Sequence, residues 1–134
     1  MTDSRRKGKT GELDLVHFFK ARGLSAYRTS QNCGKGGVDD VRIVELPWVH
    51  NECKRTERFR LYDALEQAVR DASEGRIPTV WHRQNGKSWV AVIDAGYQLD
   101  IYLETASLRK RVRDLEAELR DIKAGNTMPD FDEY

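Results

Sequence analysis

The sequence predicts an α/β fold with a mixed sheet and a separate helix at its C-terminal end. Two amphipathic helical patterns cover about residues 12–22 and 61–74. Strand patterns occupy residues 24–29, 41–45, 49–54, 77–83 and 88–93. Asn85-Gly86 lies between the last two runs and predicts a two-residue hairpin. A heptad repeat beyond residue 98 predicts the third helix.

The composition fits one compact domain with an appendage. The chain has 134 residues, of which 39% are hydrophobic and 34% charged, enough for a core that folds alone. No apolar run approaches the roughly 20 residues of a membrane span, and Met1 to Lys7 does not resemble a signal peptide. Cys33 and Cys53 form neither a ligand pair nor a disulfide framework. We therefore expect a reduced, cytoplasmic protein with no membrane association.

The net charge of +1 hides an asymmetry along the chain. Residues 1–97 hold 17 Lys and Arg against 13 Asp and Glu, whereas residues 98–134 hold 6 against 9. A basic head suits a phosphate backbone, although surface charge without a partner explains it equally well.

A predicted hairpin places acidic residues beside one another. Asp40 opens the apolar run at residue 41, Pro47 marks the turn, and the next run carries Glu52 and Lys54. Alternation puts Glu52 and Lys54 on one face, and strand pairing brings Asp40 beside Glu52. His50 alternates onto that face too. Two carboxylates with few other ligands suit Mg²⁺, which assists phosphodiester hydrolysis by activating water and neutralising phosphate charge.

Two helical residues have alternative interpretations. Glu12 lies in the apolar stripe of Leu15, Val16 and Phe19; it either favours the helix dipole or supplies a third metal-facing carboxylate. Gln67 on the second helix is either a surface residue or reaches the site to hydrogen-bond a phosphate or a metal-bound water.

Basic residues in three segments are candidate contacts to DNA phosphates. The segments are the glycine-bearing stretch 5–11, the glycine-rich loop 30–37 with its preceding strand, and the stretch after the hairpin. A plain flexible connection is an alternative for the loop. The candidates are Arg5, Arg6, Lys7, Lys9, Arg28, Lys35, Arg55 and Arg58.

Over about residues 5–97 the chain resembles the PD-(D/E)xK nuclease superfamily, and within it the archaeal-type Holliday junction resolvases and their phage relatives. Lys7-Gly8-Lys9-Thr10-Gly11-Glu12 is similar to their opening K-G-x-x-x-E, and Arg28-Thr29-Ser30 to the arginine and serine ahead of their loop. Gly37-Val38-Asp39-Asp40-Val41 and Glu52-Cys53-Lys54 match the core motif. Asp39 stands where the motif usually has proline, so the ligand is Asp40, which directly precedes the strand, or Asp39.

The resemblance implies a restriction-endonuclease-like core (α-β-β-β-α-β-β) over residues 1–97. It implies a Mg²⁺ or Mn²⁺ site made by Glu12, Asp40, Glu52 and the Cys53 carbonyl, with Lys54 at the attacking water and Ser30 among the DNA contacts. Four-way DNA junctions are the expected substrate, cut to leave 5′-phosphate and 3′-hydroxyl. The alternatives are a nuclease acting on flaps, ends or restriction sites, and a catalytically idle DNA-binding module.

The heptad repeat predicts a coiled-coil helix over residues 98–124. Its d positions are Ile101, Leu108, Leu115 and Ile122, and its a positions are Thr105, Val112 and Leu119. In a parallel homodimer all g-to-e′ contacts join opposite charges: Glu104 with Arg109, Arg111 with Glu116, and Glu118 with Lys123. An antiparallel pair instead opposes Glu104 to Glu118 and Arg111 to Arg111. Packing of this helix on its own head is the alternative.

The last ten residues, 125–134, are acidic with aromatic anchors and are expected to be disordered. Such a tail is able to dock on another protein or to cover a basic groove.

Overall fold

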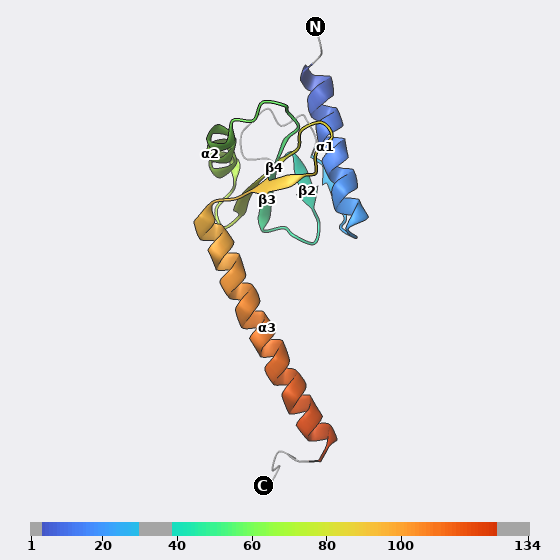
Figure 1. The fold of residues 1–134 in the computed structure, drawn as a ribbon, viewed down its shortest axis with the longest axis vertical. Helices are drawn as coiled ribbons and strands as arrows, with labels where there is room; N and C mark the ends of the chain where they lie inside the picture. The colour runs from blue at the N-terminus through green and yellow to red at the C-terminus, as the bar shows by residue number, and fades with distance from the viewer. Residues whose placement is uncertain (1–3, 30–38, 126–134) are drawn as a thin grey trace. The chain divides into compact units, whose positions relative to one another are not determined.

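The computed structural model describes residues 4–29 and 39–125 (Figure 1). The chain forms two compact units, Met1–Asp94 and Ala95–Tyr134, so the division falls three residues before the expected one at 97/98. Ser30, Lys35 and the expected acidic tail lie outside the described residues.

The first unit is an α/β structure built on a five-stranded mixed sheet, as predicted. Its elements are α1 (Ser4–Ala21), β1 (Ala26–Arg28), β2 (Val41–Ile43), β3 (Val49–Lys54), α2 (Leu61–Asp71), β4 (Ile77–His82) and β5 (Val90–Val92). The strands lie in the order β1-β2-β3-β4-β5. Only β3 and β4 are parallel, and α2 makes the crossover between them.

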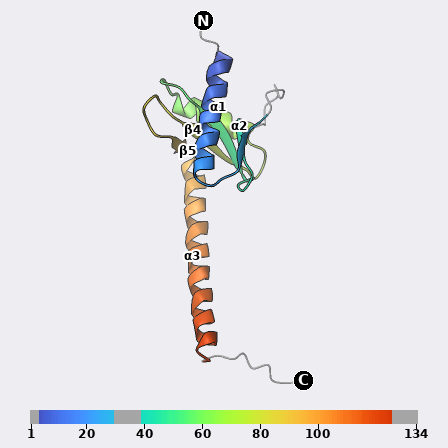
Figure 2. The same ribbon diagram turned by 90° about the vertical axis from the view of Figure 1, so that its right-hand side faces the viewer.

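The two helices cover opposite faces of this sheet (Figures 1 and 2). On one face, Leu15, Val16 and Phe19 of α1 pack against Ala26, Val41 and Ile43. On the other face, Ala64 and Ala68 of α2 pack against Val80. Strand alternation therefore directs Asn51 and Cys53 toward α1, and His50, Glu52 and Lys54 toward α2.

Helix α1 begins at Ser4, not near residue 12, so the basic stretch 5–11 forms its first turns. The predicted helix began after this glycine-bearing stretch, but Gly11 lies within α1 and is buried. A Cβ at Gly11 would lie 2.6 Å from the Cβ of Arg55. The absent side chain thus lets α1 approach the end of β3 next to Glu12.

The predicted two-residue hairpin at Asn85-Gly86 is wrong in its length. These residues do form a turn, closed by Lys87 N donating to Gln84 O, but strand pairing already stops at His82 and Val90. The backbone N–H of Arg83 donates to Lys54 O instead. The connection between β4 and β5 is longer because Arg83, directly after β4, is bound to Lys54 at the end of β3.

The second unit contains one long helix, α3 (Ala95–Lys123), of 29 residues, none of them buried. It starts three residues before the predicted position. In the part of the chain that the structure describes, no helix has the length and hydropathy to cross a membrane.

We expect Gly11→Ala to destabilise the protein, because overpacking costs about 1–3 kcal/mol while better helix propensity returns about 1 kcal/mol. The matched control is Gly8→Ala, whose Cβ meets nothing within 4 Å and should stabilise by about 0.5–1 kcal/mol. Urea unfolding of both variants measures the two changes. A gain in both would contradict close packing at Gly11.

Candidate active site

Asp40 and Glu52 form an acidic pair at the end of β3. Asp40 N donates to Asn51 O, which holds Asp40 in register with β3. Two residues further along β3, the Asp40 carboxylate accepts the Cys53 N–H at 2.8 Å. This backbone bond fixes the Asp40 carboxylate where the charge of Glu52 acts on it.

Asp40 keeps its proton up to near-neutral pH. Burial raises the pKa of Asp40 to about 7, together with the negative charges of Glu52 and, more weakly, Glu12. Loss of solvent and a neighbouring negative charge both disfavour the ionised form of a carboxylate, and the partly buried Asp40 experiences both. The three predicted acids therefore influence one another, although they come from α1, the turn before β2, and β3.

Glu12 approaches this pair without completing a cluster. Its Oε2 accepts from Arg28 Nε at 2.7 Å, and both side chains are less than one-fifth exposed. Within residues 4–29 and 39–125, no three His, Cys, Asp or Glu side chains are grouped as metal ligands. Glu12 affects the pKa of Asp40 without belonging to a group of metal ligands among these residues. Both observations hold because charge acts over many ångströms, whereas coordination to Mg²⁺ needs oxygens about 2.1 Å from the ion.

Lys54 lies on the same face as Glu52, as alternation predicted. Its Nζ donates to Gln67 Oε1 at 2.8 Å, so α2 holds the ammonium group. Gln67 therefore contacts Lys54, whereas the predicted role was a hydrogen bond to a phosphate or a metal-bound water.

Asp39 belongs to a buried ionic chain beneath the acidic pair. Its carboxylate is fully buried and binds Arg76, whose Nη2 lies 2.6 Å from Asp39 Oδ2. His50 lies between two acids, with Nδ1 3.0 Å from Asp39 Oδ1 and Nε2 2.8 Å from Glu52 Oε1. The order is Arg76, Asp39, His50, Glu52. Because Asp39 is bound in this chain, Asp40 is the one of the two aspartates that faces Glu52.

Charge balance explains why these buried groups are tolerated. Burial disfavours the charged form of Asp39, but hydrogen bonds from His50 and Arg76 outweigh it and hold its pKa well below the usual range. Burial also opposes a charged His50, yet Asp39 and Glu52 raise the pKa of His50 to about 9. Two cations and two anions therefore alternate along the chain.

The donor set suits a divalent cation. Asp40, whose pKa is raised to about 7, lies next to the Glu52 charge, and a cation is able to bind carboxylate oxygens here in place of the Asp40 proton. The carbonyl of Cys53 points to the same side of β3 as its N–H, toward Asp40. Glu12 would join these oxygens only by turning away from Arg28.

A basic groove begins at Lys54. Its lining comes from the segment after β3 and from α2: Lys54, Thr56, Arg58, Phe59, Arg60, Asp63, Ala64, Gln67 and Arg70. The lining includes four cations against one carboxylate, Asp63, which pairs with Arg60 at 3.0 Å. His82 stacks on Phe59 with ring centroids 3.9 Å apart and bonds Thr56 O, which fixes the segment.

The other predicted DNA contacts are dispersed. Arg6, Lys7 and Lys9 are exposed on the first turns of α1, whereas the side chain of Arg5 is outside the described part. Arg55 binds Asp14 and Arg83 O, and Arg28 binds Glu12, so both guanidinium groups have internal partners. Nη2 of Arg28 is buried and, among the described residues, without a hydrogen-bond partner.

Sequence interpretation missed Arg76, Arg60 and Arg70 as site residues. Arg70 follows Gln67 by three positions, so helical spacing would have placed it on the same face. Nothing in the sequence alone connects Arg76 to Asp39, because the contact depends on the parallel pairing of β3 with β4.

Comparison with protein families, with curated proteins and with solved structures found no match for this chain.

We expect Arg76→Met to destabilise the protein by about 3 kcal/mol, because it removes both guanidinium bonds to a buried carboxylate and leaves only His50 and the more distant, partly exposed Arg42, at 3.7 Å, as cationic partners. Arg60→Met is the matched control. Arg60 is 86% exposed in its pair with Asp63, so its loss should stay within about 0.5 kcal/mol. Denaturant unfolding measures the loss of stability in both variants. Equal losses would contradict a larger contribution from the buried ion pair than from the exposed one.

In EDTA we expect the free energy of unfolding to fall as pH rises from 5 to 8. Asp40 binds its proton more tightly in the folded state (pKa about 7) than when unfolded (3.8). Deprotonation therefore costs the folded state about 2.6 kcal/mol across that interval. The contribution of His50 is complete below 6.5 and is lost as pH rises through about 9, so it has the same sign.

Asp40→Asn should flatten this slope, leaving stability near wild type at pH 5 and higher by about 2.6 kcal/mol at pH 8. Asp63→Asn, an exposed change on α2, is the control and should keep the wild-type slope. Urea titrations at both pH values measure it. Parallel curves for Asp40→Asn and wild type would contradict the raised pKa of Asp40.

Proposed function

We propose that this chain is a metal-dependent endonuclease with a restriction-endonuclease-like core, acting on branched DNA and most concretely on four-way junctions. The observation that carries the proposal is the acidic pair Asp40 and Glu52, which lies beside Lys54 at the start of a basic groove. The proposed substrate rests on the resemblance in the sequence. The proposed reaction rests on the positions of the acidic pair, Lys54 and the groove.

A bound Mg²⁺ or Mn²⁺ would lower the pKa of a water and neutralise charge on the scissile phosphate. Asp40, Glu52 and the Cys53 carbonyl would hold it, with Glu12 as the further acid. His50 fixes one Glu52 oxygen, Oε1, and leaves Oε2 for a ligand. Arg28, freed from Glu12, has a guanidinium available for a phosphate oxygen.

Lys54 is assigned to the reacting phosphate. Its ammonium group, held by Gln67, is suited to hold the attacking water or to offset charge on the phosphate oxygens. Water adds to phosphorus in line as the bond from phosphorus to the 3′ oxygen breaks, giving 5′-phosphate and 3′-hydroxyl ends. The groove with Arg58, Arg60 and Arg70 suits the DNA backbone on one side of this point.

Two alternatives keep parts of this assignment. A nuclease for flaps, ends or restriction sites would use the same acids on another DNA shape. A catalytically idle module would use the groove alone and would cut nothing.

We expect wild-type protein with Mg²⁺ to cut a labelled four-way junction in preference to a linear duplex or a flap, and not to cut in EDTA. Asp40→Asn and Glu52→Gln should each lower cutting at least about 100-fold while junction binding persists. Glu66→Gln, which changes an exposed carboxylate of α2 that does not line the groove, should retain activity. Cleavage that survives both site changes would refute the assigned site.

A second readout does not depend on activity. Mg²⁺ should raise the melting temperature of wild-type protein at pH 8, because it binds the folded state and relieves the repulsion between Asp40 and Glu52. The same addition should leave Asp40→Asn nearly unchanged. Equal shifts in both proteins would place the cation elsewhere.

A further inference from the structure

Helix α3 carries an apolar seam that stays exposed within the described part of the chain. Its five C-terminal seam residues are each 45% to 58% exposed, and no residue of the helix is buried. Their spacing of three and four residues keeps them on one stripe for the length of the helix. The stripe consists of Leu108, Val112, Leu115, Leu119 and Ile122.

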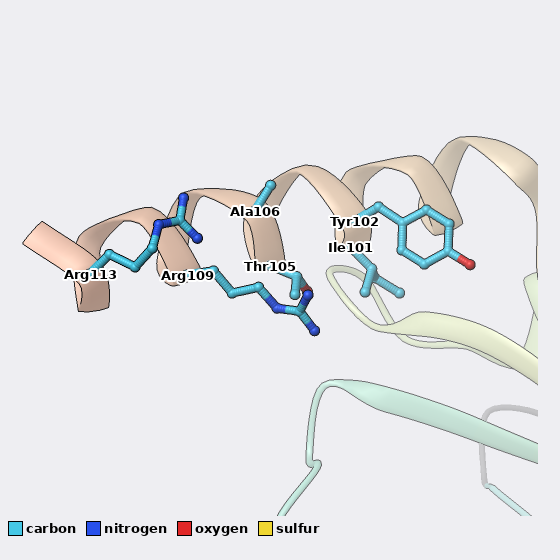
Figure 3. Close-up of a pocket in the computed structure, with 6 residues that line it drawn as sticks. All are labelled: Ile101, Tyr102, Thr105, Ala106, Arg109 and Arg113. Carbon is cyan, nitrogen blue, oxygen red and sulfur yellow. The ribbon is translucent and has the colours of Figure 1, made fainter.

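The surface of the seam has the form of a coiled-coil hole. A shallow groove on α3 is lined by Thr105, Leu108, Arg109 and Val112, with Arg113 at its side. In the heptad these four are the a, d, e and following a positions, the set that receives a d side chain from a parallel partner. The adjoining hollow continues it by one turn, where Ile101, Thr105 and Arg109 extend from one side of the helix (Figure 3).

We propose that α3 pairs in parallel and in register with α3 of a second copy of this chain. The partner's Leu108 would then fill the groove beside Arg109. Val112 at a, with Leu108 and Leu115 at d, favours two strands over three or four.

The charges beside the seam favour a second copy of α3 as the partner, and they favour a parallel orientation of the two helices. In the parallel pair, Arg111 of one copy meets Glu116 of the other, and the contacts of Glu104 with Arg109 and of Glu118 with Lys123 also join opposite charges. In the antiparallel pair Arg111 would meet Arg111. Only the parallel arrangement makes the helix complementary to itself.

The consequence deepens, and rests on, the proposed nuclease function. Because α3 follows directly after Asp94, a parallel pair has both Met1–Asp94 units at the same end of the coil. A twofold axis then relates two active sites, and a four-way junction has two strands that are related in the same way. The pair is suited to cut both strands of one junction.

The first test is the mass of the full-length chain by equilibrium sedimentation. We expect a dimer, and we expect Leu115→Lys to weaken dimerisation at least tenfold. Leu103→Lys makes the same substitution on the opposite face, where Leu103 is 68% exposed, and should remain dimeric. A monomeric wild type, or equal loss in both variants, overturns the proposal.

The second test fixes the direction of the pair. Arg111→Glu should weaken the parallel dimer, because Glu then opposes Glu116, and adding Glu116→Arg should restore it. Oxidation should cross-link Ile122→Cys rapidly but not Leu103→Cys, with wild type run alongside for its native cysteines. Absence of rescue together with absence of the Ile122→Cys cross-link overturns the parallel pairing.

A plasmid that extrudes a cruciform separates failure of this inference from failure of the function. Wild type should yield linear product, which needs two cuts in one encounter, whereas Leu115→Lys should yield mainly nicked circles. A protein that dimerises but cuts nothing refutes the nuclease and leaves the dimer standing. Linear product from the monomeric variant refutes the role of pairing.

Discussion

The arrangement of this unit depends on holding two carboxylates together where their charges repel. Asp40 and Glu52 lie side by side, and the fold fixes each from a different direction. The Cys53 backbone holds Asp40, while His50 holds Glu52 from below. His50 is itself held by Asp39 and, through Asp39, by Arg76. Since Arg76 directly precedes β4, the parallel pairing of β3 with β4 around α2 is what brings the last cation to the site.

This arrangement places stabilising and destabilising interactions next to each other. The buried chain alternates in charge, and its His50–Glu52 hydrogen bond holds Glu52 in a defined position. The acidic pair above it is not satisfied without a proton or a cation, which raises the pKa of Asp40. Strain of this kind is typical of ligand sites, because binding removes the cost. An apolar pair at these positions would be easier to bury, but it would offer nothing to a metal or a phosphate.

Local patterns in the sequence predicted the element order, the mixed sheet and the long C-terminal helix, and they placed Asp40, Glu52 and Lys54 on neighbouring positions. Alternation and spacing suffice for those features because they are properties of single elements or of one hairpin. The start of α1 was wrong because Gly11, which suggests flexibility in a sequence, is required here by the approach of Arg55. Asp39 and Arg76 were not connected because they are 37 residues apart and meet only through the tertiary fold.

Both units of the chain use alternating opposite charges, but for different purposes. In the first unit, opposite charges alternate within the buried interior and hold one carboxylate in place. Along α3, opposite charges alternate at the edges of an apolar seam, where each exposed pair contributes only about 0.3–0.5 kcal/mol. Such weak pairs cannot fold a helix, but six of them in a symmetric dimer all favour one orientation. In the proposed dimer, burial of the seam would supply the affinity and the charges the direction, so the same sequence would also set where the second copy of the proposed active site lies.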